Sequence, residues 1–259
     1  MHVQMISILG GRGRAAPDLV DRVDLDMGEV TSIVGPTGSG KTTLINDIEL
    51  FADGDTPSGR RVLFDGAAAP SEYRDDPSCN PVALITQHTT FLSDLPVGVF
   101  LETHARVRGG AEEVDSLVRE TLSFANELTG EPIVRDVRMT ELSGGQTRAL
   151  LVADAAVICS TPVVLLDEVE NAGIHRARAL ALLRRYRKLF VFVTHDPHIA
   201  LMSDSRIVMR EGRMVDFIRT SAAERELAAR VGRVDDVLAA LRDRLRDGHH
   251  LDGTELGGL

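Results

Sequence analysis

Aromatic residues are scarce in this chain of 259 residues, at 4%, and tryptophan is absent. Proteins that bind single-stranded nucleic acid stack bases on aromatic rings, so the chain has little from which to build such a surface. Positive charge is also in deficit, because 39 Asp and Glu against 29 Lys and Arg give a net charge of −10. Nucleic acid is therefore not expected as the main partner. The basic run RRYRK at 184–188 is interpreted as the solvated face of a helix.

Long apolar runs and closely spaced cysteines are missing too. No apolar stretch approaches the roughly 20 residues that a transmembrane helix needs, and the start, MHVQMISILGG, lacks the blocks of a secretory signal. Cys79 and Cys159 are the only cysteines, and two isolated thiols fit a reducing compartment. The histidines are too sparse to predict a metal site, including the pairs 195/198 and 249/250. We expect a cytoplasmic protein without a disulfide.

Apolar runs and helical patterns alternate along the chain. Residues 163–166 and 189–194 are near-continuous apolar runs, which is typical of strands buried on both faces of a parallel sheet. The segment between them, HRARALALLRRYRK, has a helical pattern, so the three form a βαβ unit and predict a parallel α/β core. Further short runs at 30–35 and 82–86 are expected to be strands. Residues 97–129 are mostly helical in pattern, with a break at Gly109-Gly110.

The last third of the chain predicts a hairpin followed by a helix. Glu211-Gly212 lies between the β-like runs 206–209 and 214–218, which indicates a tight turn. The segment 221–246 has apolar residues three or four positions apart, as in an amphipathic helix. These residues are Leu227, Val231, Val234, Leu238, Leu241 and Leu245. The helix is expected to cover the core, with a dimer contact as the alternative, and the polar, Gly-rich residues 247–259 are expected to be mobile.

The segment GPTGSGKTT at 35–43 matches the phosphate-loop pattern G-x-x-x-x-G-K-[ST] and lies between a predicted strand and a predicted helix. Gly38 and Gly40 let the backbone turn so that its N–H groups point at a phosphate, next to the positive end of the helix. Lys41 is expected to reach the β- and γ-phosphates, and Thr42 to ligate magnesium. The expected cofactors are therefore ATP and Mg²⁺.

A second motif, VVLLDE, spans residues 163–168 and ends in two acidic residues. Asp167 ends a buried strand, where a carboxylate can orient magnesium through water. Glu168 follows directly and can polarise the water that attacks the γ-phosphate. We interpret Glu168 as the catalytic base; an acidic strand-to-loop turn is the structural alternative.

The order of five motifs resembles that of the ATP-binding cassette (ABC) ATPases. The motifs are GPTGSGKTT, Gln87 in LITQHTTFL, LSGGQ at 142–146, VVLLDE, and His195 in FVTHD. The resemblance covers roughly residues 1–220 and implies a phosphate-loop NTPase core with a mostly parallel sheet flanked by helices. It also implies an antiparallel β subdomain and an inserted α-helical subdomain. The implied boundaries are 1–220 for the ATPase domain with its helical insertion at about 88–146, 221–246 for a helical cap, and 247–259 for a tail.

The resemblance also implies where ATP binds. In this family two cassettes dock head to tail, and each ATP lies between the phosphate loop of one and the LSGGQ motif of the other. Gln87 is expected to contact magnesium and the attacking water, and His195 the γ-phosphate. Catalysis is thus assigned to Glu168, His195, Gln87 and Lys41, and metal binding to Thr42, Gln87 and Asp167. The nucleotide-binding residues are Gly35, Pro36, Thr37, Gly38, Ser39, Gly40, Lys41, Thr42, Thr43, Ser143, Gly144, Gly145 and Gln146.

The chain departs from the family pattern in several places. Cassettes usually stack adenine on an aromatic ring upstream of the phosphate loop, but residues 1–50 contain no aromatic residue, and Leu9 or a neighbour stands near that position. We therefore expect poor discrimination between ATP and GTP. After Glu168 the sequence is VENAGIH, without the expected Asp, and the helix between 175 and 189 is short. Asp154 stands where many cassettes have Arg.

The function implied by the resemblance is that of an ATP-hydrolysing subunit of a membrane transporter. The chain would dimerise with a copy or a relative, and would power a separate transmembrane subunit from the cytoplasmic face of the membrane. Apolar residues in QHTTFLSDLPVGVFLE are candidate contacts for that subunit, with the core of the helical lobe as the alternative: Phe91, Leu92, Leu95, Val97 and Phe100. The alternative function is that of a soluble cassette ATPase that drives remodelling, such as metallocofactor assembly or enzyme activation.

Overall fold

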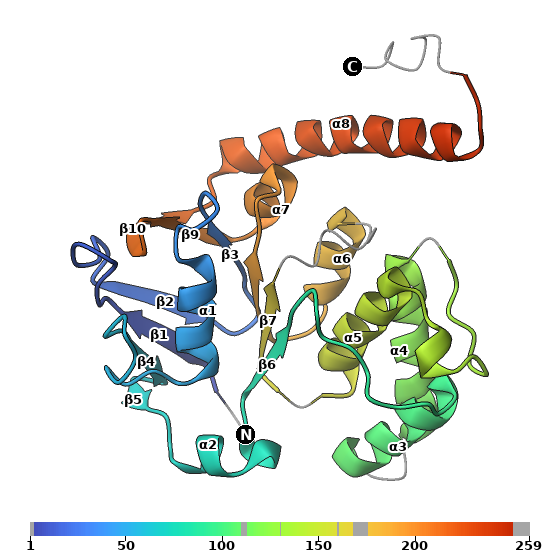
Figure 1. Ribbon diagram of the computed structural model, residues 1–259, viewed down its shortest axis with the longest axis horizontal. Coiled ribbons are helices and arrows are strands. Elements are labelled where there is room, and N and C mark those ends of the chain that lie inside the picture. The colour runs from blue at the N-terminus through green and yellow to red at the C-terminus, as the bar shows by residue number, and fades with distance from the viewer. Residues whose placement is uncertain (1–2, 110–112, 130, 160, 168–175, 251–259) are drawn as a thin grey trace.

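The structure, a computed structural model, describes residues 3–109, 113–129, 131–159, 161–167 and 176–250. A six-stranded sheet forms its centre, with the strand order β10-β9-β3-β8-β7-β6 (Figure 1). All neighbouring strands of this sheet are parallel except for the edge pair β9 and β10. The strands are β3 (Val30–Val34), β6 (Val82–Ile85), β7 (Val163–Asp167), β8 (Leu189–Val193), β9 (Ser205–Arg210) and β10 (Arg213–Arg219). The predicted mixed α/β fold is thereby confirmed.

The central strands are hydrophobic because both faces of the sheet are covered. All five residues of β8 are buried, and so are the first four of β3 and of β7. One face packs against α1 (Lys41–Glu49), and the other contributes Phe190 and Phe192 to the core shared with the helical lobe. A parallel sheet buried in this way needs continuous apolar strands.

A second, antiparallel sheet lies beside α1 (Figure 1). Its strand order is β2-β1-β4-β5, and its strands are β1 (Met5–Leu9), β2 (Arg22–Asp26), β4 (Arg61–Phe64) and β5 (Ala67–Ala68). Ile6, Ile8, Val23 and Leu25 are fully buried against the same core as α1. After β5 follow the short helix α2 (Glu72–Asp75) and a single 3₁₀ turn at Pro77–Cys79. The motif pattern had implied this subdomain, although no strand within residues 1–29 was identified from its own periodicity.

A helical lobe lies on the opposite side of the central sheet (Figure 1). It contains α3 (Val97–Gly109), α4 (Val114–Leu128), a 3₁₀ turn at Met139–Glu141 and α5 (Gly144–Val157). The predicted break at Gly109-Gly110 agrees with the end of α3. The last turns of α5 run from this lobe toward β7, and Ala149, Leu150 and Ala153 are fully buried.

In the described part of the chain after β7, the helices are α6 (Arg176–Leu183), α7 (Pro197–Met202) and α8 (Ala222–Arg246). The helix predicted through residue 188 ends at Leu183, so RRYRK is a turn rather than a helix face. Two of its side chains contact other parts of the fold. Arg184 forms an ion pair with Asp204 at 3.0 Å, and Tyr186 donates a hydrogen bond to Glu120 at 2.7 Å.

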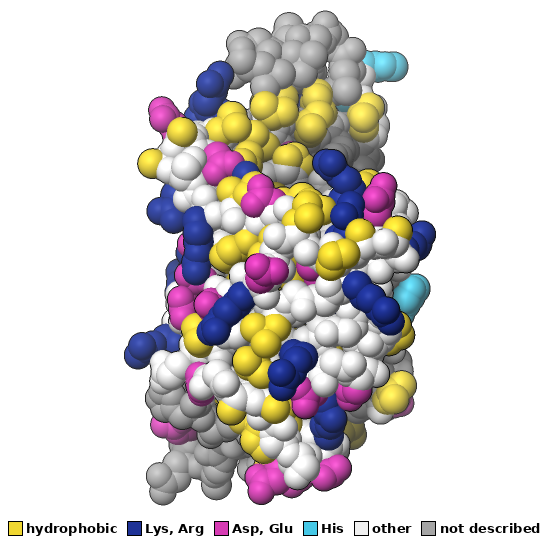
Figure 2. Space-filling view, turned by 90° about the vertical axis from the view of Figure 1, so that its left-hand side faces the viewer, with side chains coloured by type: hydrophobic (Ala, Val, Ile, Leu, Met, Phe, Trp, Pro, Cys, Tyr) yellow, Lys and Arg dark blue, Asp and Glu magenta, His cyan; other side chains and the backbone are white. Residues whose placement is uncertain are grey.

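The long helix α8 packs on α7 through its first half and extends along the top of the molecule in Figure 1. His198 Nδ1 lies 2.9 Å from Asp235 Oδ2, and Ala228 is buried in this contact region. Four of the predicted apolar residues stay 42–59% exposed: Leu227, Val234, Leu238 and Leu245. At the same height in Figure 2, apolar side chains gather on the surface, whereas acidic and basic side chains are interspersed over the rest of that face. None of the described helices combines the length and apolar character needed to cross a membrane.

Candidate nucleotide site

The carboxyl ends of four neighbouring parallel strands bring most of the predicted site residues to one edge of the central sheet. The phosphate loop follows β3, His195 follows β8, Asp167 ends β7 and Gln87 follows β6. The strand order β3-β8-β7-β6 places them in that sequence along the edge, with Asp167 in register with Val193 and Leu166 with Ile85. Ligands of open α/β sheets bind at this edge.

The phosphate loop turns tightly between β3 and α1. Gly38 and Gly40 have φ of 76° and 96°, in the left-handed region that glycine adopts without steric cost. A Cβ at Gly40 would lie 2.8 Å from Cα of Gly212, so the loop also needs glycine for close packing. Helix α1 begins at Lys41, directly after Gly40. The first N–H groups of α1 and its dipole therefore favour an anion at the loop.

Lys41 closes the phosphate loop from inside. It is 7% exposed, and its Nζ donates to the carbonyl oxygens of Gly35 at 2.8 Å and Pro36 at 3.2 Å. Thr42 and Thr43, the next residues of α1, are exposed. Ser39 is 3% exposed, and its hydroxyl oxygen is buried without a hydrogen-bond partner among the described residues. A buried hydroxyl without a partner is costly, so this group favours a ligand that supplies one. The loop thus offers an ammonium, hydroxyls and helical N–H groups to a polyphosphate.

The β9–β10 hairpin supports the loop from the side. Glu211 and Gly212 have φ of 54° and 84°, which agrees with the predicted tight turn. The N–H of Gly212 donates to the carbonyl of Ser39 at 2.8 Å. This contact connects residues far apart in the sequence and fixes the loop against the edge hairpin.

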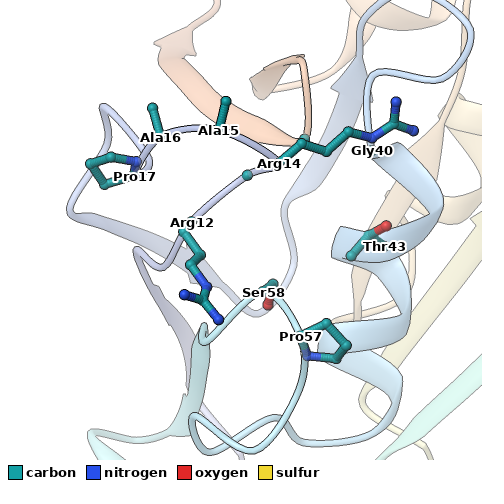
Figure 3. A pocket seen from close by; sticks show the side chains of 11 residues that line it. Arg12, Arg14, Ala15, Ala16, Pro17, Gly40, Thr43, Pro57 and Ser58 are labelled. Carbon is teal, nitrogen blue, oxygen red and sulfur yellow. The ribbon is translucent and has the colours of Figure 1, made fainter.

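A cavity of about 680 Å³ opens beside the loop (Figure 3). The segment between β1 and β2 forms one wall, and Gly40, Thr43 and Gly212 contribute to the rest. In Figure 3 the side chain of Arg14 reaches toward Gly40 at the start of α1, whereas Arg12 points toward Ser58. Leu9, the residue expected near a nucleotide base, lies in β1 and does not line the cavity. The cavity is instead lined by two exposed arginines, Arg12 and Arg14.

A buried guanidinium anchors this cavity. Arg60 is fully buried, donates through Nε and Nη2 to both oxygens of Asp18 at 2.9 Å, and lies 3.2 Å from Asp47 of α1. Its Nη2 also donates to the carbonyl of Gly212 at 2.8 Å. Burial would raise the pKa of Asp18, but Arg60 and the N–H groups of Gly11 and Met214 together lower it. Arg60 thus ties the antiparallel sheet to α1 and to the hairpin turn.

The LSGGQ motif forms the exposed N-terminus of α5. Ser143 is the N-cap; its hydroxyl accepts from the N–H of Gln146 at 3.3 Å, and the Gln146 side chain accepts from the N–H of Ser143 at 2.9 Å. This capping box holds the first turn in place. Ser143 and Gly144 are exposed, so this helix end is open to a group outside the chain.

Arg148 connects the LSGGQ helix to the segment that follows β6. Its Nη2 donates to the carbonyl oxygen of Gln87 at 3.0 Å, while Gln87 itself is exposed. This hydrogen bond joins the segment around Gln87 to α5. The sequence analysis did not identify this arginine as a site residue. Its position two residues after LSGGQ could have indicated a role near that motif.

Part of the predicted catalytic set lies outside the described residues. These are Glu168 and all of VENAGIH at 169–175, since the described chain resumes at 176. Asp167 is half-buried and His195 is exposed, each at the end of its strand. Of the candidate contacts for a membrane subunit, some are buried in the helical lobe and others are exposed. Val97 is fully buried and Phe91 and Phe100 pack against the core, whereas Leu92 is wholly exposed and Leu95 is 43% exposed.

Known proteins resemble the chain along most of its length. Residues 21–171 match the family described as ABC transporter. An uncharacterized ABC transporter ATP-binding protein of Methanocaldococcus jannaschii is 46% identical over 252 residues, which are 97% of this chain and 96% of the relative. The macrolide export ATP-binding/permease protein MacB of Bradyrhizobium diazoefficiens is 32% identical over 80% of this chain, which spans 32% of that relative.

The fold has solved counterparts. The structure of cbiO1 from Clostridium perfringens, part of the ABC transporter complex cbiONQ, superposes with a TM-score of 0.64 at 21% identity, covering 91% of this chain and all of that one. The relatives carry transporter names, which favours a transporter component over the soluble remodelling machine. The family match and the relative at 46% identity lead to one conclusion: this chain belongs to the ABC transporter family of ATP-binding proteins.

Proposed function

We propose that the chain binds and hydrolyses ATP as a subunit that dimerises and powers a separate membrane subunit. The observation that carries this proposal is the arrangement at the edge of the central sheet. The phosphate loop, His195, Asp167 and Gln87 follow four adjacent strands, and the loop presents Lys41 and the N-terminus of α1. The ATPase domain would span 1–220 with its helical part at about 88–146, followed by the cap 221–246 and a tail at 247–259.

Each residue of the loop has a separate task in this proposal. Lys41 holds the β- and γ-phosphates, while the hydroxyl of Ser39 and the N–H groups of residues 35–43 surround the phosphate oxygens. Magnesium, when bound, neutralises charge between the phosphates. Thr42, Gln87 and Asp167 are the residues that would hold it.

Hydrolysis requires a positioned water on the far side of the γ-phosphate. Glu168 would accept its proton, and His195 and Gln87 would orient it. Glu168 comes directly after Asp167 in the sequence, and Asp167 ends β7 at the same edge of the sheet as the phosphate loop. This position in the chain supports Glu168 as the base.

The LSGGQ motif would serve the ATP of the partner subunit. The N-terminus of α5 is exposed at Ser143 and Gly144, and the N–H groups of Ser143 and Gln146 are bonded within the capping box. The N–H groups of Gly144 and Gly145, which as the first of the helix have no acceptor within it, would face the phosphate together with the Ser143 hydroxyl. A second cassette, either a copy or a relative, would insert its γ-phosphate there, and loss of that phosphate would release the pair. The Arg148–Gln87 bond would then relay the change to the surface near Gln87.

The proposed membrane partner would dock beside that segment, at the cytoplasmic face of the membrane. Leu92, Leu95 and Val99 are 100%, 43% and 45% exposed and follow Gln87 closely in the chain. Apolar side chains exposed together in this way are typical of a protein contact. The buried Val97 and the partly buried Phe100 would support this surface from within the lobe.

The proposal is tested by trapping the dimer. Glu168→Gln should bind Mg·ATP without hydrolysing it and form a closed dimer, which sedimentation or light scattering detects. Adding Ser143→Ala should weaken that dimer at least tenfold, because it removes a donor to the partner's γ-phosphate. It also removes a helix cap worth about 1 kcal/mol, so thermal unfolding must confirm that the variant is folded.

A matched control is Ser123→Ala, at an exposed serine on α4, which should leave the dimer unchanged. The assignment would be contradicted if Glu168→Gln remained monomeric at saturating Mg·ATP. It would also be contradicted if Ser143→Ala left the affinity of the dimer unchanged. Normal hydrolysis by Glu168→Gln would remove Glu168 as the base.

Base recognition is expected to depend on Arg14. Its guanidinium lies beside the phosphate loop where no aromatic ring is present, and a guanidinium can stack on any base. Arg14→Ala should therefore weaken ATP and GTP binding alike, about fivefold for a stacking energy near 1 kcal/mol. Competition of both nucleotides with a fluorescent analogue measures this. A strong preference for ATP in the unmodified protein would contradict the prediction.

A further inference from the structure

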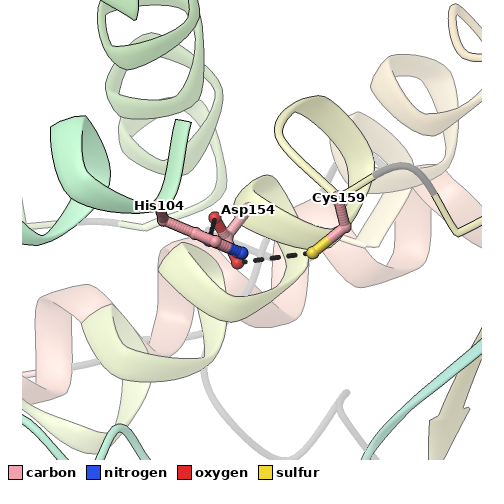
Figure 4. A group of neighbouring side chains, drawn as sticks. All are labelled: His104, Asp154 and Cys159. Carbon is pink, nitrogen blue, oxygen red and sulfur yellow. Dashed lines mark hydrogen bonds and ion pairs between the residues drawn. The ribbon is translucent and has the colours of Figure 1, made fainter. Parts of the chain in front are cut away.

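Three potential metal ligands meet in the helical lobe, away from the phosphate loop (Figure 4). His104 lies on α3, Asp154 near the end of α5, and Cys159 just after α5. The ligand atoms of these three residues all lie within 4.8 Å of one another. Their sequence spacing did not predict this, because His104 and Asp154 are 50 positions apart.

The contacts between the three residues are direct. His104 Nδ1 lies 2.8 Å from Asp154 Oδ1, and the thiol of Cys159 donates to Asp154 Oδ2 at 3.7 Å. The Asp154 side chain is 9% exposed and that of His104 21%, so the group is sheltered but reachable from solvent. Ligands of a tetrahedral zinc ion stand about 3 to 4 Å apart, given bond lengths of about 2.0 to 2.3 Å. The separations of 2.8 and 3.7 Å are close to this range, and the limit of 4.8 Å between any two ligand atoms exceeds it, so the three side chains would move slightly to bind an ion.

The backbone holds the group in place from two sides. On α3, the neighbours Leu101 and Ala105 are fully buried, which fixes the position of His104. At the end of α5, the N–H groups of Ile158 and Cys159 both donate to the carbonyl of Asp154 at 2.9 Å, which turns Cys159 back toward Asp154. Lys188 closes this helix end by donating to the carbonyls of Ala155 and Cys159. A preformed geometry of this kind lowers the entropy cost of binding an ion.

We propose that His104, Asp154 and Cys159 form a binding site for a zinc-class divalent cation. Imidazole nitrogen, carboxylate oxygen and thiolate sulfur are the three ligand types that Zn²⁺ accepts, and three protein ligands leave a fourth position for water. The thiolate and the carboxylate carry two negative charges, which match the charge of the ion.

Binding is an exchange of protons for metal, without oxidation or reduction. The Cys159 thiol donates to Asp154 in this structure, so the sulfur carries a proton before the ion arrives. The ion replaces that proton: the S–H bond breaks, the proton goes to solvent and the sulfur–metal bond forms. Nδ1 of His104 becomes a ligand when neutral imidazole carries its hydrogen on Nε2. Lys188 and Arg108, the nearby cations, favour the thiolate form.

The ion would join α3 to the end of α5, the helix whose N-terminus carries LSGGQ. The site shares no residue with the nucleotide site, so it is independent of the proposed ATPase function. Its test uses the nucleotide-free protein and no measurement of hydrolysis. All proteins in the test carry His249→Asn and His250→Asn, because the two adjacent histidines could bind metal themselves.

The test is a Co²⁺ and Zn²⁺ titration of the metal-stripped protein in a non-thiol reductant. One equivalent of Co²⁺ should give a thiolate-to-cobalt charge-transfer band and the intense visible bands of tetrahedral cobalt. One equivalent of Zn²⁺ should abolish both and should raise the Tm. Cys159→Ser should lose the charge-transfer band and bind Zn²⁺ at least 100-fold more weakly. His104→Gln should also weaken binding, while keeping a hydrogen bond to Asp154.

Cys79→Ser is the matched control, because the Cys79 thiol also lies 3.7 Å from a carboxylate, that of Asp76, but outside this group of three. It should leave the spectrum and the affinity unchanged. Cys159→Ser changes one atom, so its fold is readily checked by unfolding. A Co²⁺ spectrum without a thiolate band, a band that persists in Cys159→Ser, or the absence of stoichiometric Zn²⁺ binding would overturn the proposal.

Discussion

Lys41→Ala is expected to abolish nucleotide binding while leaving the protein folded. Lys41 is the charged group inside the phosphate loop, with Nζ donating to the carbonyls of Gly35 and Pro36. A charge-assisted hydrogen bond contributes about 1.5 to 3 kcal/mol, and Lys41 is expected to form more than one with a triphosphate. The affinity for ATP should therefore fall by about 100-fold or more, as titration calorimetry can measure.

The control for Lys41 is Arg61→Ala, which removes one positive charge from the exposed edge of β4. Arg61 forms an ion pair with Asp53 at the surface, and its side chain is 51% exposed. This variant should bind ATP as the unmodified protein does. Tight binding by Lys41→Ala would show that the loop at 35–43 does not hold the phosphates.

Arg60→Met is expected to cause the largest loss of stability. The change leaves the buried carboxylates of Asp18 and Asp47 without their shared guanidinium. Removing one partner of a buried ion pair costs about 3 to 5 kcal/mol, because the remaining charge stays out of water. Urea unfolding measures this difference. The cavity beside the phosphate loop should lose its shape at the same time, since Arg60 also holds the carbonyl of Gly212.

The neighbouring position again supplies the control. The exposed Arg61–Asp53 pair should contribute at most about 1 kcal/mol, so Arg61→Ala should unfold close to the unmodified protein. Combining Arg60→Met with Asp18→Asn should recover part of the lost stability, because one uncompensated charge is removed. A loss below about 1 kcal/mol in Arg60→Met would show that the cluster is not a structural anchor.

The same cluster predicts a dependence on pH. The pKa of Asp18 lies below its ordinary value of 3.8 in the folded protein, so its ionised form stabilises the fold at every pH above that value. This contribution is lost as the pH falls through the lowered pKa. The stability difference between the unmodified protein and Arg60→Met should therefore be largest near neutral pH and shrink in strong acid. A difference that stays constant from neutral pH into strong acid would contradict this account.

Patterns local in the sequence predicted the central elements well. The apolar runs at 163–166 and 189–194 became β7 and β8, because a strand buried on both faces has no polar position to interrupt it. Glu211-Gly212 formed the expected tight turn. Both residues have positive φ, as the two central residues of a type I′ hairpin turn do. Residues 184–188 were wrongly extended from α6, whose last residue is Leu183. The helical propensity of that run was overridden by the contacts of Arg184 and Tyr186 with other elements.

The sequence by itself determined the parallel α/β core, the phosphate loop, and the order of motifs that identifies the family, because each of these is written in neighbouring residues. Only the tertiary structure decided which distant side chains meet. Asp18 and Arg60 are 42 positions apart, and His104 and Asp154 are 50 apart, yet each pair is in contact. Such contacts depend on how the layers stack around the shared cores, and no local periodicity encodes the distance across a sheet or between two helices.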